Sequence, residues 1–147
     1  MKDLTDIAGV GKLGYSLAPQ TVATATTTNG ASFDCNHCEG RIQAVAITGN
    51  CGDSSLVLTF KVQEAIEDPA SAGSPLSSDW SDVTGGAFDS IGGASGADNT
   101  MRAKAIDRTK RFLRMVATTA GAGTLSAPIA GGFIARKKMA GGLGVKL

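Results

Sequence analysis

The chain has little of what catalysis usually needs. Aromatic residues make up 5% of its 147 residues, with one Trp and one Tyr, and there is a single histidine, His37. A histidine-based catalyst would have to use His37, but its neighbour Cys38 is adjacent in sequence, whereas catalytic partners usually come from separate elements. The composition therefore predicts a protein that is not an enzyme, needs no cofactor, and binds or holds another molecule.

Long apolar runs and a leader are also missing. The apolar segments are far shorter than the ~20 residues that a membrane-spanning helix needs. Residues 1–20 lack the basic stretch followed by an apolar run that a secretory leader would have. We therefore expect a protein that is made in the cytoplasm and has no membrane partner.

Charge of one sign is not in excess either. With 14 Lys and Arg against 13 Asp and Glu, the net charge is +1, which gives no overall attraction to nucleic acid. Residues 110–114 and 136–138 form short basic clusters, but few of the aromatic side chains that stack on single-stranded bases lie near them. We expect no nucleic-acid partner.

The charges are unevenly placed along the chain. Residues 64–98 contain acids but no Lys or Arg, whereas residues 102–146 are rich in Lys and Arg and contain one acid, Asp107. The two segments either face each other in adjacent strands or mark complementary surfaces between subunits. The sequence leaves both interpretations open.

Short segments of alternating apolar residues, separated by turns rich in Gly, Ser and Asp, make up most of the chain. In residues 56–63, for example, the apolar side chains at 56, 58, 60 and 62 share one face. No helix-length amphipathic stretch separates these segments, which disfavours a parallel α/β fold. The pattern predicts an all-β protein, an antiparallel β-sandwich or jelly roll of about eight strands with extended N- and C-terminal arms.

The expected strands follow from the alternation and from the turn residues between them. The pair Asn29-Gly30 predicts a hairpin that joins the first two strands. Trp80 and Val83 are expected to anchor a short strand within the loop-like segment at 68–99, because a long structureless loop is uncommon in a compact domain. The expected strands are residues 21–28, 31–35, 41–48, 56–65, segments near 80–83 and 88–91, and residues 100–106, 111–119 and 125–135.

The same pattern divides the chain into an N-terminal arm at residues 1–20, a sandwich domain at 21–138 and a flexible C-terminal tail at 139–147. The glycines of the N-terminal segment argue against a stable helix there, and its exposed apolar residues need a surface to cover them. We therefore predict that both ends contact a partner. The predicted partner-binding residues are Leu4, Ile7, Val10, Leu13, Tyr15, Leu17, Arg136, Lys137 and Lys138.

One group of residues resembles a metal site: Cys35, His37, Cys38 and Cys51. The two-residue gap between Cys35 and Cys38 is a spacing that zinc favours. However, His37 and Cys38 are consecutive, so turning both toward one ion demands an awkward backbone, and small thiols are commonly buried for packing alone. We predict no metal site and keep a zinc site at these four residues as the alternative.

Three segments together resemble a known family. They are residues 56–64 (LVLTFKVQE), 80–88 (WSDVTGGAF) and 110–118 (KRFLRMVAT), followed by a Gly/Thr turn, an apolar strand and a basic tail. In this order they are similar to the capsid cement, or decoration, proteins of tailed bacteriophages. The similarity covers residues 21–138, and the chain departs from the family pattern at residues 35–51 and in an insertion at 70–79.

The resemblance implies a virion structural protein made in the host cytoplasm and placed on the outer surface of a phage head. Such a protein would bind the major capsid protein, stabilise the shell through added contacts, and associate with itself as a dimer or trimer. Two alternatives stay open. One is a phage tail or head–tail connector component, and the other is a carbohydrate- or surface-binding β-sandwich module, for which Trp80 and Tyr15 are the large aromatic candidates.

Overall fold

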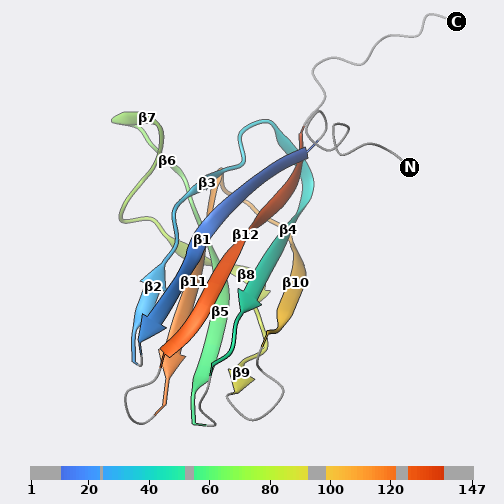
Figure 1. Cartoon of the computed structure of the whole chain (residues 1–147). Helices are drawn as coiled ribbons and strands as arrows, with labels where there is room; N and C mark the ends of the chain where they lie inside the picture. The colour runs from blue at the N-terminus through green and yellow to red at the C-terminus, as the bar shows by residue number, and fades with distance from the viewer. Residues whose placement is uncertain (1–10, 24, 52–54, 93–98, 122–125, 138–147) are drawn as a thin grey trace, which may run out of the picture.

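The computed structural model describes residues 11–23, 25–51, 55–92, 99–121 and 126–137. Within these ranges the chain forms twelve strands, of which eight are at least five residues long. The strand pairs are antiparallel, and two sheets pack face to face (Figure 1). The prediction of an all-β, antiparallel sandwich is confirmed. The described part of the chain contains no helix with the length and apolar character to cross a membrane.

The two main sheets, called A and B here, have four and six strands. Sheet A runs in the order β1 (Gly11–Ala23), β12 (Ser126–Lys137), β4 (Cys38–Thr48) and β10 (Met101–Ile106). Sheet B runs in the order β2 (Thr27–Asn29), β11 (Phe112–Ala120), β5 (Val57–Ala65) and β8 (Ser81–Ala87), with β3 (Phe33–Asp34) also on β11 and β9 (Ile91–Gly92) also on β5. A small hairpin of β6 (Glu67–Asp68) and β7 (Ser71–Pro75) extends from one end.

Alternation of apolar side chains builds the core between the sheets, because every second residue of a strand points to the same face. In sheet B, the predicted inward set at 56, 58, 60 and 62 is buried. In sheet A, alternate residues of β4 and β12 are buried against it. The rings of Phe33 and Phe133 meet across the sandwich with centroids 5.4 Å apart, and Phe60 meets Phe88 edge-on.

Val83 anchors the loop-like segment at 68–99 as expected, whereas Trp80 precedes β8 and is not buried. Val83 on β8, Phe88 and Ile91 on β9 are all buried, while Trp80 is partly exposed. The acidic segment lies against the basic one within the same chain: Lys110 pairs with Asp79 at 3.0 Å. Arg111 pairs with Glu67, and Arg102 with Asp89. These ion pairs support the first of the two interpretations, in which the acidic and the basic segment face each other within one chain.

The predicted hairpin at Asn29-Gly30 is wrong. β2 and β3 do not pair with each other; both pair with β11, one after the other along its edge. The chain continues straight through this point because Gly30 N–H donates to the carbonyl of Met115 at 2.8 Å. Gly30 is required there because a Cβ would collide with that same carbonyl oxygen and with Ser16.

The predicted boundary of the N-terminal arm at residue 20 is also corrected, since β1 begins at Gly11 and pairs with β12 along its length. The register shifts between Tyr15 and Leu17, which marks a β-bulge. As a result, Leu13 is 76% exposed whereas Leu17 is fully buried at 0%. Leu17 belongs to the core and is not available to a partner.

Leu17→Ala and Leu13→Ala form a matched pair that tests this assignment on one strand. We expect Leu17→Ala to lower the free energy of unfolding by about 2–5 kcal/mol, because it leaves a cavity between the sheets. Leu13→Ala should change it by ~0.5 kcal/mol or less, since its side chain is exposed. Urea unfolding followed by circular dichroism measures both, and equal effects of the two substitutions would contradict the position of the bulge.

Candidate functional site

The outer surface of sheet A is a continuous apolar face. The strand register aligns its outward side chains in three rows across the sheet. The rows are Leu13, Ile134, Gln43 and Ala105; then Tyr15, Gly132, Val45 and Ala103; then Ala130, Ile47 and Met101. Gln43 is the one polar side chain in these rows. We call this surface the apolar face; sheet A is the nearer sheet in Figure 1.

Several of these apolar side chains are well exposed to solvent. Tyr15 is 71% exposed and Met101 is 69% exposed, and both lie on the outermost strands of the sheet. Four strands at the usual spacing of ~4.8 Å and three rows at ~6.8 Å make the face about 400 Å² in plan. Contiguous apolar patches of this size on a soluble protein commonly mark an interaction site.

Charged side chains lie at one end of the apolar face and are paired with each other. Arg136 on β12 pairs with Glu39 on β4 at 3.1 Å, and Arg41 pairs with Asp107 at 3.1 Å. These pairs are exposed, so they add little stability. In each of these two pairs the charge of the base is balanced by the acid beside it.

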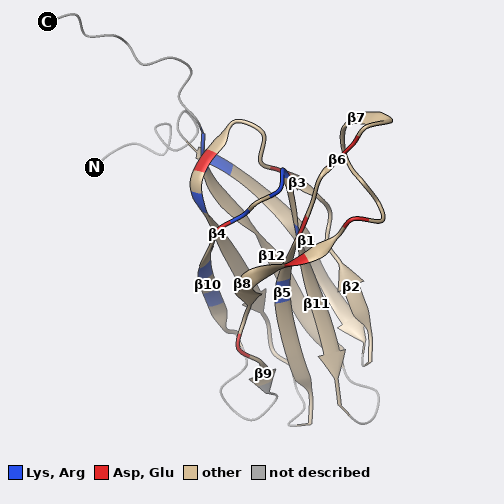
Figure 2. Cartoon of the chain, turned by 180° about the vertical axis from the view of Figure 1, so that it is seen from behind, with Lys and Arg blue, Asp and Glu red and all other residues tan. Residues whose placement is uncertain are grey.

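The outer surface of sheet B has the opposite character. Arg114 donates two hydrogen bonds to the Gln63 side-chain oxygen, at 2.9 and 2.7 Å. Asp82 accepts hydrogen bonds from Lys61 and from Gln63, at 2.9 and 2.8 Å. The guanidinium of Arg114 also lies 4.3 Å from the ring centroid of Trp80. Figure 2, seen from behind relative to Figure 1, shows the acidic and basic positions on this side. Sheet B thus presents a polar network, and the apolar face is particular to sheet A.

The predicted partner-binding residues are distributed between the apolar face, its border and the core. Leu13 and Tyr15 lie on the apolar face, Arg136 and Lys137 lie at its charged end, and Leu17 is in the core. The rest of the predicted set, namely Leu4, Ile7, Val10 and Lys138, falls outside the described residues.

Sequence reasoning missed most of the apolar face, which includes Val45, Ile47, Met101 and Ile134. A signal was present in β4, where apolar residues occupy both alternating sets: Ala44 and Ala46 point inward while Val45 and Ile47 point outward. An antiparallel strand with one solvated face would carry polar residues in the outward set. A strand that is apolar on both faces is typical of a surface that something else covers.

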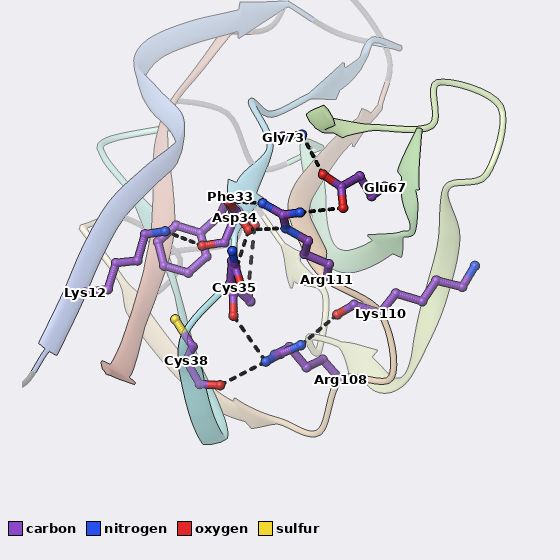
Figure 3. A network of polar contacts seen from close by, with 11 residues as sticks. Lys12, Phe33, Asp34, Cys35, Cys38, Glu67, Gly73, Arg108, Lys110 and Arg111 are labelled. Atoms are coloured by element: carbon purple, nitrogen blue, oxygen red, sulfur yellow. Dashed lines mark hydrogen bonds and ion pairs between the residues drawn. The ribbon is translucent and has the colours of Figure 1, made fainter. Parts of the chain in front are cut away.

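The cysteine-containing turn at residues 35–38 is held by Arg108, as Figure 3 shows. The guanidinium of Arg108 donates to the carbonyl oxygens of Cys35 and Cys38, at 3.2 and 3.1 Å, and to that of Lys110 at 3.0 Å. Both thiols are buried, and burial raises the pKa of Cys35 to about 12 and raises that of Cys38 as well. At neutral pH both side chains are therefore neutral thiols, which are poor nucleophiles and poor metal ligands.

The structure does not bring together the four residues of the zinc alternative. Cys38 begins β4, whereas Cys51 follows the other end of the same strand, which is about 30 Å long. His37 occupies the turn with a φ of 61°, a left-handed conformation that makes the turn possible. No cluster of three or more His, Cys, Asp or Glu side chains that would suit a metal ion occurs among the residues that the structure describes.

A charged network next to this turn ties both sheets and the β6–β7 hairpin together (Figure 3). Arg111, which directly precedes β11, donates to the two carboxylate oxygens of Asp34 at 2.9 and 3.0 Å, and it pairs with Glu67 at 2.6 Å. This guanidinium holds the pKa of Asp34 below its ordinary range. From sheet A, the Lys12 ammonium donates to the backbone carbonyl of Asp34. The network is structural, because its donors and acceptors satisfy each other.

Glu64 is a buried carboxylate whose hydrogen bonds hold the loop between β10 and β11 in place. It accepts hydrogen bonds from the hydroxyl and N–H of Thr109, at 2.6 and 2.7 Å, and from Lys110 N–H at 3.0 Å. Burial raises the pKa of Glu64, but these hydrogen bonds outweigh burial and leave the pKa below its usual 4.5. The ionised form is therefore the one that the fold stabilises.

Glu64→Gln tests this role through its pH dependence. At pH 7 we expect the variant to be less stable by about 1–3 kcal/mol, because an amide replaces a carboxylate that accepts three hydrogen bonds. The pKa of Glu64 is lower in the folded state, so its contribution is present above pH 4.5 and declines as the pH falls through the folded pKa. The stability difference between the two proteins should shrink accordingly in acid. A difference that stays constant from pH 7 to pH 3 would contradict the assignment.

Thiol labelling tests the cysteine environment. The chain has three cysteines, all of them buried. We expect a chromogenic disulfide reagent at pH 8 to react slowly with the folded protein, because the thiols are inaccessible and those of Cys35 and Cys38 have raised pKa values. The same reagent in denaturant is the control and should titrate all three thiols. Rapid reaction of two thiols in the folded protein would show that the turn at residues 35–38 is open.

Comparison with known proteins gives a likeness of fold. No protein-family model matches the chain, and no curated protein matches it in sequence. Among solved structures, it is similar to a chain in the structure of infectious bursal disease virus, Gx strain, with a TM-score of 0.54 and 9% identity. The match covers 88% of this chain and 33% of the viral one, so this chain spans about a third of that protein's length. The chain thus shares its β-sandwich fold with part of a viral protein.

Proposed function

We propose that the chain is a structural protein of a virus particle, a cement protein that binds the major capsid protein on the outer surface of a tailed-phage head. The observation that carries this proposal is the apolar face of sheet A, a surface suited to holding another protein. The fold likeness to part of a viral chain supports a virion role.

The segments that resemble the cement family are neighbours in space. Residues 56–64 include most of β5, residues 80–88 include β8, and residues 110–118 include most of β11. β11, β5 and β8 are successive strands of sheet B. These three segments therefore form one structural unit in sheet B, and the apolar face of sheet A is the surface that would meet the shell.

The physical task of a cement protein suits this molecule. A protein that binds the assembled shell and not its separated subunits stabilises the assembly by mass action. That task needs contact area and no chemistry. About 400 Å² is half of the ~800 Å² that each partner buries in a standard interface. Attachment of one copy by this face alone would be weak, whereas several linked copies would reinforce one another through avidity. This is consistent with the expected dimer or trimer.

The carbohydrate-binding alternative gains no support from the two large aromatic candidates. The Trp80 ring is covered on one side by Arg114. Tyr15 lies among aliphatic side chains, and no Asp or Glu shares its row of the sheet. A sugar site needs hydrogen-bonding groups beside the aromatic ring to fix orientation.

Electron cryomicroscopy of phage heads that lack the protein, after incubation with the purified chain, tests the proposal. We expect ordered copies on the outside of the icosahedral shell, in contact with the major capsid protein. Density confined to the neck or tail would favour the connector alternative instead. If no copies attach to any part of the particle, the proposal is wrong, and glycan-array binding becomes the next measurement.

A further inference from the structure

The apolar face is hollow in its centre. A depression of about 200 Å³ opens over Gly131 and Gly132 of β12, bordered on one side by β1 and on the other by β4. Its walls are the side chains of Leu13, Tyr15, Val45, Ile47 and Ile134. The floor is the backbone of the glycine pair, which is paired with β1 and β4, and the walls are apolar side chains, so the lining is mostly apolar and includes no charged residue.

The fold itself keeps this hollow empty of its own side chains. Gly132 points outward, and a Cβ on it would collide with the backbone carbonyl of Gly14 on β1. Gly131 points inward, where a Cβ would collide with Met115. Neither position accepts a side chain without moving β1 or the core, so the floor stays open while both walls carry large residues.

The size and lining of the hollow define what fits it. A dry apolar cavity of about 150 Å³ holds a benzene molecule, so 200 Å³ accommodates one large aliphatic or aromatic side chain. An uncharged lining excludes an anion, a metal ion or a charged peptide, which would lose hydration there without a partner. Anchor side chains of this kind, seated in a pocket at the centre of an interface, commonly dominate its binding energy.

A second copy of the same face is a poor occupant. When two hollow faces meet, their walls touch and their centres remain apart, which leaves a void whose lining has no contacts. Edge-to-edge pairing through β10 is opposed as well, because Arg102 and Lys104 on this outer strand reach toward Asp89 and Ala87 across the sandwich. Inward charges of this kind protect a sheet edge from pairing. The occupant that fits is a protruding apolar side chain on a different protein.

The geometry points to the hollow over Gly131 and Gly132 as the socket for one apolar anchor side chain, of the Leu or Phe class, that projects from the shell subunit. This inference rests on the proposed cement function and locates its contact. It assigns the central role to Tyr15, Val45 and Ile47, which form opposite walls of the hollow.

Four single variants test the socket. Ile47→Asp and Tyr15→Asp put a charge on a wall. Val45→Phe fills the hollow while keeping the face apolar. The matched control is Val57→Asp, since Val57 is a β-branched residue on the outer surface of sheet B that is 39% exposed, against 40% for Ile47. Circular dichroism and thermal unfolding confirm that each variant is folded, and co-sedimentation of labelled protein with purified shells that lack it gives the Kd.

We expect Ile47→Asp, Tyr15→Asp and Val45→Phe each to weaken shell binding by about 30-fold or more, as the loss of a central anchor contact does. Val57→Asp should bind like the wild type. Val45→Phe discriminates best between a socket and a general apolar contact. A surface that binds through its apolar area alone would bind as well or better when Phe replaces Val45, whereas the added ring would block a socket.

Failure of the inference is distinguishable from failure of the proposed function. If the wild type binds the shells and the three variants bind equally well, the socket is wrong while the cement function stands. If the wild type binds no shell, the cement function is wrong and the socket assignment falls with it. Sedimentation velocity of the free proteins adds a third outcome: an oligomer that dissociates on Ile47→Asp but not on Val57→Asp would show that a second copy occupies the face and would overturn the inference.

Discussion

The sandwich depends on one junction, where Ser16 of β1 joins the two sheets. Its buried hydroxyl accepts a hydrogen bond from Met115 N–H at 2.8 Å and donates one to the carbonyl of Ala31 at 2.7 Å. Its own carbonyl accepts from Ala31 N–H at 2.7 Å. One serine therefore links sheet A with the segment that follows β2 and with β11. Loss of any of these buried partners would leave an unsatisfied polar group, which is costly in the interior.

A bulge beside this junction decides that Leu17 of β1 faces the core. Ser16 points toward sheet B by simple alternation with Leu13 and Tyr15, which point outward. The bulge between Tyr15 and Leu17 turns Leu17 inward as well, so Ser16 and Leu17 are consecutive buried residues. Without it, Leu13, Tyr15 and Leu17 would lie on one face by simple alternation. The bulge thus supplies a core residue at Leu17, while Leu13 and Tyr15, which precede it, lie on the apolar face.

The bulge in β1 and its long-range contacts explain which parts of the structure could be predicted from the sequence. Strand β5 was predicted closely because its alternation is regular, and β11 was predicted closely because its mostly apolar run lies between turn residues. The start of β1 and the path of the chain through Gly30 were not, because both depend on pairing between residues about 100 positions apart. A bulge has no fixed sequence signature, so the sequence did not indicate that Leu13 is exposed while Leu17 is buried. The apolar face was missed for a related reason: it is assembled from four strands whose order only the tertiary structure gives.

The distribution of charge constrains how such a face would meet its partner. Acids and bases that are separated in sequence pair within the chain, as Arg111 does with Glu67 and Asp34, so few unbalanced charges remain on the described surface. Electrostatic steering accelerates association strongly only between complementary charged surfaces. Among the described residues, an apolar face with self-paired ions at its border offers little such steering. In the proposed cement role, a high local concentration of copies around a shell would replace steering, and the shape of the face would provide specificity. A hollow that the backbone of Gly132 keeps open is the feature of this face best suited to provide it.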